Sequence, residues 1–278
     1  MNCKSIILLI VVLLFWGNAE ARKKKGKKVE EVQTESAYRK FFKGKACETA
    51  KGMITLHKMD GRVYFEIPLA LMGREMLMGS TISEITNNGF GSVGEKPKGL
   101  LYISFVRCDS VISLKQLTAQ YDTNEENLKQ RIKESTIPAT IKNFKITTYN
   151  EDSTAVVIDM TDYLVSADEA IDPFSPWAPI LAGGERVMEK EFRRENSQVV
   201  SIKAFEDNVS VKSSLTYGLS LKNKVMYIFQ REPFTAVMTR SFILLPEHPM
   251  RPRLADPRIA IFSQGVSVFN GDSRGAQA

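Results

Sequence analysis

Two histidines are the only imidazole side chains in the 278 residues, and they limit the hydrolytic chemistry that the chain could perform. A nucleophile usually needs a histidine base beside it, and a catalytic zinc ion needs three protein ligands. The sequence contains no GxSxG, HExxH or HxxEH motif. We therefore expect no catalytic residues and no metal site in this chain.

The surroundings of the two histidines support this expectation. His57 shares a predicted strand face with Thr55, opposite Ile54 and Leu56, so it is expected to face solvent. His248 lies between prolines in a predicted rigid turn. A hydrolase remains an alternative, and it requires both histidines to meet a carboxylate in the folded chain.

Two other patterns with possible chemistry have structural explanations. Gly89, Gly91 and Gly94 have the GxGxxG spacing of a dinucleotide loop, but Pro97 interrupts the helix that must follow it. We interpret this segment as a hairpin loop with no cofactor. Paired carboxylates could hydrolyse glycosides, but Asp162 follows a predicted strand, where helix capping explains it.

Two cysteines remain after a predicted signal peptide is removed. Cys47 and Cys108 lack the CxxC spacing of metal sites. An oxidising compartment permits a disulfide between them, and two free thiols are the alternative. The sequence gives no distance with which to choose.

The first 35 residues indicate export. Residues 1–21 contain Lys4, the apolar run Ile6–Trp16 and Ala19-Glu20-Ala21, which are the three parts of a signal peptide. The run is too short to cross a bilayer, so we expect no transmembrane span. Residues 22–35 form a basic leader whose six Lys and Arg side chains equal the net charge of +6. No aromatic residue interleaves them, so we expect no nucleic-acid partner.

The elements that would position any site are mostly strands. Residues 54–56 and 63–67 alternate around a predicted Asp60-Gly61 turn, and residues 209–221 alternate over one long strand or hairpin with a possible bulge at Gly218. Short helices are predicted at 36–42, at 68–73 and, after a capping box at Thr123, at 124–134.

These elements predict the fold class and the domains. We expect an α+β fold, predominantly antiparallel β with a few short surface helices. The domains are expected to be a small N-terminal β-rich module at residues 36–94, a larger β-rich domain at 98–262 and a linker-like tail at 263–278.

Two groups of residues could bind a partner. Leu245–Arg258 reads LPEHPMRPRLADPR, and we call it the strap. It is either a polar linker or a stiff segment that docks another domain through Arg251, Arg253, Asp256 and Arg258. Phe174 and Trp177 lie in a proline-rich loop, where they form either a platform for a peptide or glycan or a plug at the edge of the core.

Four stretches give the chain a resemblance to a known family. It resembles the amino-terminal, non-catalytic half of large exported zinc-dependent metalloproteases of bacteria, in which two domains of unknown function precede a metzincin-like catalytic domain. The stretches are KGMITLHKMDGRVYFEIPLALMGREML (51–77), VVIDMTDYLVSAD (156–168), AFEDNVSVKSSLTY (204–217) and SFILLPEHPMRPRLADPRIAIF (241–262).

The resemblance implies a function and a partner. The family's zinc ligands, an HExxH helix and a third histidine, match no position here, so zinc is expected only in a catalytic domain that is missing from this truncated chain. The chain is then a periplasmic, surface or secreted accessory region that docks that domain in cis or trans. The alternative is a free-standing peptide- or glycan-binding module.

Overall fold

The computed structural model describes residues 35–118, 121–123, 125–175, 186–223, 229–248, 250, 258, 267–270 and 273–277. The chain divides into two compact units, Met1–Glu35 and Ser36–Ala278. The predicted signal peptide, and all of the basic leader except Glu35, lie outside the described residues. Within the described ranges, every helix is too short or too polar to cross a membrane.

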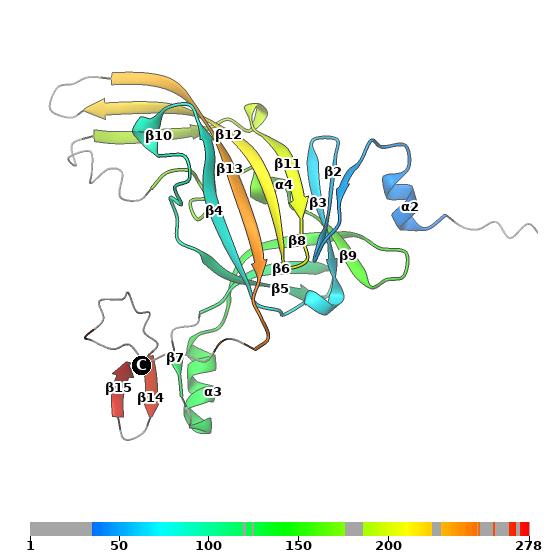
Figure 1. Cartoon of the computed structure of the whole chain (residues 1–278), viewed down its shortest axis with the longest axis vertical. Coiled ribbons are helices and arrows are strands. Elements are labelled where there is room, and N and C mark those ends of the chain that lie inside the picture. Colours follow the sequence, from blue (N-terminus) through cyan, green and yellow to red (C-terminus); the bar gives the residue numbers. More distant parts are fainter. Residues whose placement is uncertain are drawn as a thin grey trace, which may run out of the picture. The chain divides into compact units, whose positions relative to one another are not determined.

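Strands are the main secondary structure in the described part of the second unit (Figure 1). Its strands are β1 (Glu48–Ala50), β2 (Thr55–Met59), β3 (Arg62–Pro68), β4 (Met76–Ile85), β5 (Leu101–Cys108), β6 (Val111–Gln116), β7 (Tyr121–Asp122), β8 (Ala139–Tyr149), β9 (Ala155–Asp159), β10 (Arg186–Phe192), β11 (Gln198–Ala204), β12 (Asn208–Asn223), β13 (Phe229–Leu244), β14 (Ser267–Asn270) and β15 (Ser273–Gln277).

The helices are few and short. They are α2 (Ala37–Phe42), α3 (Glu126–Ser135) and α4 (Thr161–Leu164), with 3-10 turns η1 (Leu69–Leu71), η2 (Asn88–Phe90) and η3 (Arg194–Asn196). All strand pairs except β7–β14 are antiparallel. The expectation of a mostly antiparallel β structure with a few short helices is confirmed.

One twelve-stranded sheet contains most of these strands, in the order β1-β2-β3-β9-β8-β6-β5-β4-β13-β12-β10, with β11 also paired to β12. Strands from the two expected modules, 36–94 and 98–262, alternate in this sheet. β3 pairs with β9, and β4 pairs with β13. The hydrogen bonds of each module therefore depend on the other.

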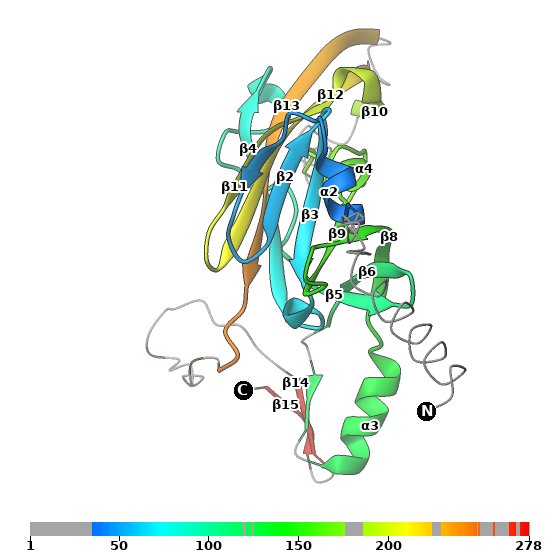
Figure 2. The same cartoon turned by 90° about the vertical axis from the view of Figure 1, so that its right-hand side faces the viewer.

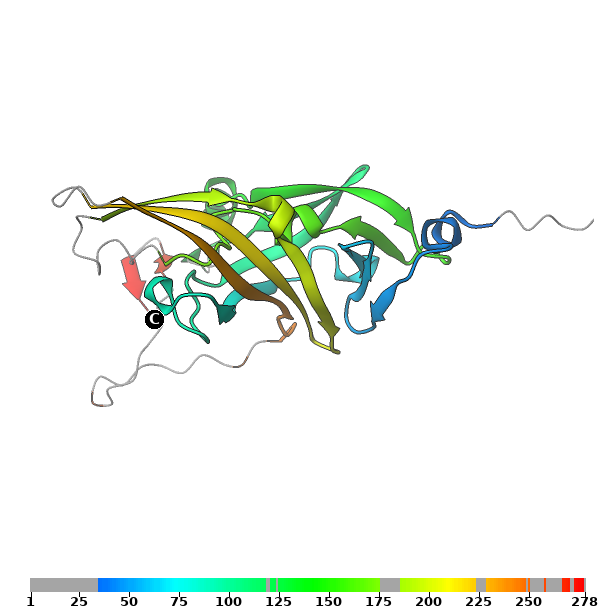
Figure 3. The ribbon, with the colours of Figure 1, turned by 90° about the horizontal axis from the view of Figure 1, so that it is seen from above.

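The sheet curls until its first and last parts meet. β4 pairs with β5 over only three residue pairs, so the sheet changes direction there, and β12 and β13 run across β5, β6 and β8 (Figures 1 and 3). At the meeting of the ends, Met53 N donates to Phe205 O at 2.8 Å. A Cβ at Gly52 would lie 2.3 Å from the same oxygen, so this contact requires glycine.

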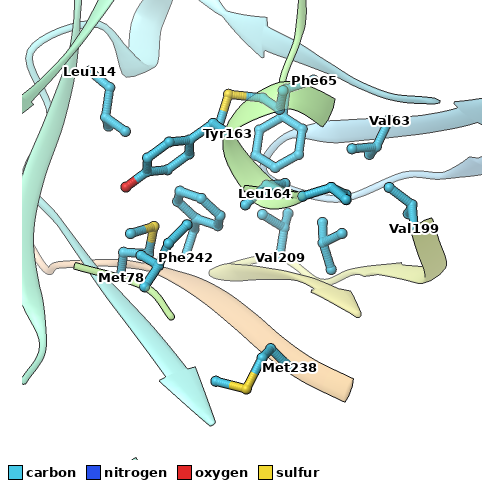
Figure 4. Close-up of a cluster of buried hydrophobic side chains, with 14 of the residues drawn as sticks. Val63, Phe65, Met78, Leu114, Tyr163, Leu164, Val199, Val209, Met238 and Phe242 are labelled. Carbon is cyan, nitrogen blue, oxygen red and sulfur yellow. The ribbon is translucent and has the colours of Figure 1, made fainter. Parts of the chain in front are cut away.

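A large apolar core fills the space inside the curl (Figure 4), and a smaller cluster of Met59, Tyr64 and Val157 packs against α2. Figure 4 shows Tyr163 and Leu164 of α4 beside Phe65 of β3 and Phe242 of β13. The rings of Phe65 and Phe242 meet edge to face, with centroids 5.4 Å apart. Short α4 is therefore largely an interior element, and its Thr161, Tyr163 and Leu164 side chains are buried.

Local sequence signals placed several elements correctly. Asp60 and Gly61 form the β2–β3 turn with φ of 52° and 72°, the left-handed pair that a two-residue hairpin favours. The alternating residues 209–221 lie in one strand, β12, and Gly218 pairs regularly with Pro233. The suggested bulge at Gly218 was wrong. The Arg193 guanidinium approaches this position, where a Cβ would lie 2.9 Å from its Nη2.

Two other predictions need correction. The helix after Thr123 exists as α3, but the capping box does not form: Thr123 Oγ1 accepts from Glu125 N, and α3 has no side-chain cap. Residues 263–278 were expected to be a linker, yet β14 and β15 form a three-stranded sheet with β7. Val268 and Phe269 explain this, because both residue types favour strands.

Candidate functional site

His57 is buried, contrary to the prediction that it faces solvent. Only 5% of its surface is exposed. Its face of β2 is covered by α2, which lies over β2 and β3 in Figure 2. The Phe42 ring of α2 lies 4.7 Å from the imidazole, centroid to centroid. The strand pattern was read correctly, but it could not show that a helix packs on the polar face.

Three polar side chains contact this imidazole. Glu66 Oε2 lies 2.9 Å from His57 Nε2, and Thr49 Oγ1 lies 3.0 Å from Nδ1. Cys47 Sγ lies 3.8 Å from the same Nδ1. A carboxylate only accepts, so Nε2 carries the ring proton and Nδ1 is left as an acceptor for the hydroxyl and the thiol.

Strand register explains why these residues meet. Thr49 of β1 lies directly opposite His57 of β2. In β3, Tyr64 lies opposite His57 and Glu66 lies opposite Thr55. Glu66 is therefore the next residue after Tyr64 on the same face of the sheet. Residues at diagonal positions of paired strands are within reach of long side chains. Cys47 immediately precedes β1.

Glu66 is held ionised by its neighbours. Hydrogen bonding from His57 lowers the pKa of Glu66, burial opposes this, and the Tyr38 hydroxyl, 2.7 Å from the same oxygen, lowers it further. The pKa of Tyr38 is raised by burial and by this carboxylate. An ionised carboxylate that accepts two hydrogen bonds fixes both the orientation and the tautomer of the imidazole.

The thiol of this cluster adjoins solvent. Cys47 is partly exposed and borders an open hollow of about 460 Å³ with Ala46, Glu48, Lys58, Met59, Asp60 and Gly61. A thiol, an imidazole and a carboxylate thus lie in a row, with the imidazole in the middle. This is the order of nucleophile, base and orienting acid in cysteine-based chemistry. We call Cys47, Thr49, His57 and Glu66 the thiol cluster.

The two cysteines are not joined. Cys47 and Cys108 are both free thiols. Cys108 is exposed at the end of β5, and its nearest polar contact is the Ser113 hydroxyl at 3.6 Å. The two thiols of the second unit therefore differ in their neighbours, since only Cys47 has an imidazole beside it.

A second polar cluster lies inside the core. Arg240 of β13 is fully buried, and its Nη2 donates to Ile171 O at 2.9 Å. Among the described residues, its Nε and Nη1 have no hydrogen-bond partner, and neither do the hydroxyls of Tyr163, Ser213 and Tyr217. Burial lowers the pKa of Arg240 to about 10, and it remains charged at neutral pH.

Asp172 supplies negative charge in this interior. It is 1% exposed and pairs with Lys98 at 3.0 Å and with Lys190 at 2.7 Å. Its Oδ1 also accepts from Phe174 N at 3.1 Å. The carboxylate therefore anchors the loop that follows α4, and two lysines share its charge.

Phe174 does not form a ligand platform. It is 3% exposed, and its ring packs on Tyr217 and Phe234 with centroids 5.1 and 5.2 Å away. It is a core plug, the alternative considered from the sequence. Trp177, the other platform residue, lies outside the described residues.

The start of the strap is fixed on the sheet. Leu245 N donates to Glu75 O at 3.0 Å, which extends the β4–β13 pairing by one bond. Arg74 donates to Leu245 O at 3.2 Å and pairs with Glu247 at 2.6 Å. Arg251, Arg253 and Asp256 lie outside the described residues, and Arg258 is an exposed turn residue.

Among the described residues, the remaining carboxylates and the second histidine form no common metal site. His248 is exposed. Within the ranges that the structure describes, no three His, Cys, Asp or Glu side chains are grouped to hold a metal ion. Asp159, rather than Asp162, accepts from Thr161 N at the start of α4, and it pairs with Arg62 at 2.6 Å. The shared histidine site is therefore not formed.

Comparison with known proteins assigns the chain to a family whose function is not known. No curated protein and no solved structure gives a significant match to the chain. Two models of domains of unknown function do match it, DUF5118 over residues 35–85 and DUF5117 over residues 95–278. The second covers well over half of the chain, which therefore belongs to the DUF5117 family and carries a DUF5118 domain ahead of it.

Proposed function

We propose that this chain is a non-catalytic accessory region that docks on the catalytic domain of an exported zinc-dependent metalloprotease. The resemblance of four stretches to such proteases supports the proposal. So does the succession of two domains of unknown function, because the resemblance implies two such domains ahead of the catalytic one. The catalytic domain is reached in cis or in trans.

The single observation that carries the docking role is the anchored start of the strap. Arg74, just before β4, holds Leu245 and Glu247, so the start of the strap has a fixed position on the sheet. A segment that is tethered at one end and stiffened by prolines loses less conformational freedom when it binds. Arginines also suit carboxylates on a partner surface, because guanidinium binds them with two parallel hydrogen bonds.

In this proposal, zinc belongs to the partner. Its ligands are the two histidines of an HExxH helix and a third histidine in the catalytic domain, and the present chain contributes docking surface. Export through the signal peptide at residues 1–21 brings the chain to the periplasm, the cell surface or the medium, where such a protease acts.

Chemical footprinting of arginines tests the docking role. The full chain is treated with phenylglyoxal, alone and with the zinc-loaded catalytic domain of an exported metalloprotease that carries the same two domains. Modification at each arginine is then measured by peptide mass spectrometry. We expect protection of Arg251 and Arg253, and no change at Arg107, an exposed residue of β5 that serves as the control.

A variant links protection to the anchored strap. Arg74→Ala removes the two side-chain contacts to Leu245 and Glu247 and leaves only the backbone bond from Leu245 to Glu75, so protection should need a higher concentration of the catalytic domain. Equal reactivity of Arg251 and Arg253 with and without the catalytic domain would refute docking through the strap.

A further inference from the structure

We propose that Cys47 is a base-assisted thiol that forms mixed disulfides with low-molecular-weight disulfides at the hollow beside it. The inference rests on the thiol cluster and is independent of the protease proposal. It assigns a reaction to a side chain that neither matched domain family explains.

The positions of Glu66, His57 and Cys47 set the direction of proton transfer, from the thiol to the imidazole. Glu66 fixes the proton of His57 on Nε2, so Nδ1 presents a lone pair toward β1. Cys47 Sγ lies 3.8 Å from this lone pair, within reach of a long S–H···N hydrogen bond. The ring can accept the thiol proton because Glu66 stabilises the imidazolium that results.

The base is held rigidly. His57 is enclosed by the Phe42 ring and by its two strand neighbours, and its side chain is 6% exposed. Tyr38 donates to the same oxygen of Glu66 and so fixes the carboxylate. A buried imidazole with both nitrogens engaged keeps a single rotamer, so the distance from Nδ1 to the thiol changes little.

Thr49 limits the reactivity of the thiol. Its hydroxyl lies 3.0 Å from Nδ1, closer than the thiol, and it also lies 3.5 Å from Cys47 Sγ. In the resting arrangement the hydroxyl occupies the lone pair that the thiol needs. The geometry thus predicts that removal of this hydroxyl makes Cys47 more reactive.

The thiol is also accessible. Cys47 lines an open hollow of about 460 Å³ that also contains Glu48, Lys58 and Asp60. Its polar rim suits a charged, water-soluble disulfide. Thiol–disulfide exchange needs a thiolate, a base and a clear approach to sulfur, and it needs no separate group to bind a developing oxyanion. The cluster supplies a thiol, a base that can take its proton, and an approach to the sulfur from the hollow.

The reaction balances without another reactant. Cys47 transfers its S–H proton to His57 Nδ1, and the sulfur attacks one sulfur of R–S–S–R′. The S–S bond breaks, and its electron pair leaves on R′–S⁻. The imidazolium returns the proton, which gives Cys47–S–S–R and R′–SH.

The experiment uses the full chain, with oxidised glutathione as the probe and Cys108 as an internal reference. Peptide mass spectrometry follows the adduct at each cysteine over time. Cys47 should react roughly tenfold faster than Cys108, since general-base assistance is worth at least this factor. Cys108 is the more exposed thiol, so exposure alone predicts the opposite order. In urea the two rates should become equal.

Two variants separate base assistance from a purely structural cluster. His57→Gln should bring the Cys47 rate down to that of Cys108, and Thr49→Val should raise it several-fold above the wild type. If His57→Gln fails to fold, as judged by circular dichroism, Thr49→Val decides, because valine keeps the shape and suits a strand. A Cys47 rate no higher than that of Cys108, or one that falls or stays unchanged in Thr49→Val, would overturn the proposal.

Discussion

Replacement of Arg240 by methionine should stabilise the fold. Burial lowers the pKa of Arg240 from its ordinary value to about 10. One pKa unit corresponds to about 1.4 kcal/mol, so keeping this guanidinium charged inside the fold costs about 3 kcal/mol at neutral pH. The penalty is fully present below pH 10, where the side chain is charged in both states. It declines only as pH rises above 10.

The substitution also removes one good contact. Arg240 Nη2 donates to Ile171 O, and loss of this bond leaves a buried carbonyl without its donor, at a cost of about 1 kcal/mol. Methionine fills most of the same volume with apolar atoms. The net expectation is a gain of about 2 kcal/mol in the free energy of unfolding, measured by urea denaturation at pH 7.

A surface variant provides the control for this measurement. Arg131 of α3 has an 82% exposed side chain, and Arg131→Met should change the free energy of unfolding by less than about 0.5 kcal/mol. If Arg240→Met instead loses 2 kcal/mol or more, the guanidinium has partners that compensate its burial, and the reasoning from an isolated buried charge is wrong.

Three other predictions concern Glu66 in the thiol cluster, the contact between Gly52 and Phe205, and the apolar core. The pKa of Glu66 in the folded chain is lowered from 4.5, so the stabilisation that its carboxylate provides is present above pH 4.5 and is lost as pH falls through the folded pKa. Glu66→Gln should therefore lower the free energy of unfolding by about 1 kcal/mol at pH 7. Urea titrations at pH 3 should show a smaller loss. Gly52→Ala forces a Cβ to 2.3 Å from Phe205 O and should lower the free energy of unfolding by about 2 kcal/mol. Gly99→Ala is the control, because a Cβ at Gly99 meets no atom within 4 Å and should change stability little. Equal effects of the two substitutions would contradict the close approach at Gly52. Phe65→Ala should cost about 4 kcal/mol in the same assay, and a loss below about 1 kcal/mol would contradict its central place in the core.

Local patterns predicted the elements but not their partners. The alternation at residues 209–221 and the Asp60-Gly61 turn depend on neighbours in sequence, and both appear in the structure. The pairing of β3 with β9 joins residues about ninety positions apart. No local period encodes such a contact, so the two expected modules could not be seen to share one sheet.

The thiol cluster was missed for a related reason. His57 was assigned to the correct strand face, but α2, which buries that face, packs through Phe42 from fifteen residues away. The signals that could have found it were the polar Glu66 among apolar residues of its strand and the spacing of ten residues between Cys47 and His57, which suits two adjacent strands. Arg240 was missed because a charged residue in an alternating strand normally faces water.

Direct binding between the full chain and the catalytic domain tests the central claim most directly. The chain is immobilised and titrated with the zinc-loaded catalytic domain, and the equilibrium constant is compared with that of an Arg251→Ala, Arg253→Ala double variant. The account predicts saturable binding that the double variant weakens at least tenfold, about 1.4 kcal/mol. Absence of binding at concentrations up to about 100 μM would contradict docking through the strap, and so would equal affinity of the original chain and the double variant for the catalytic domain.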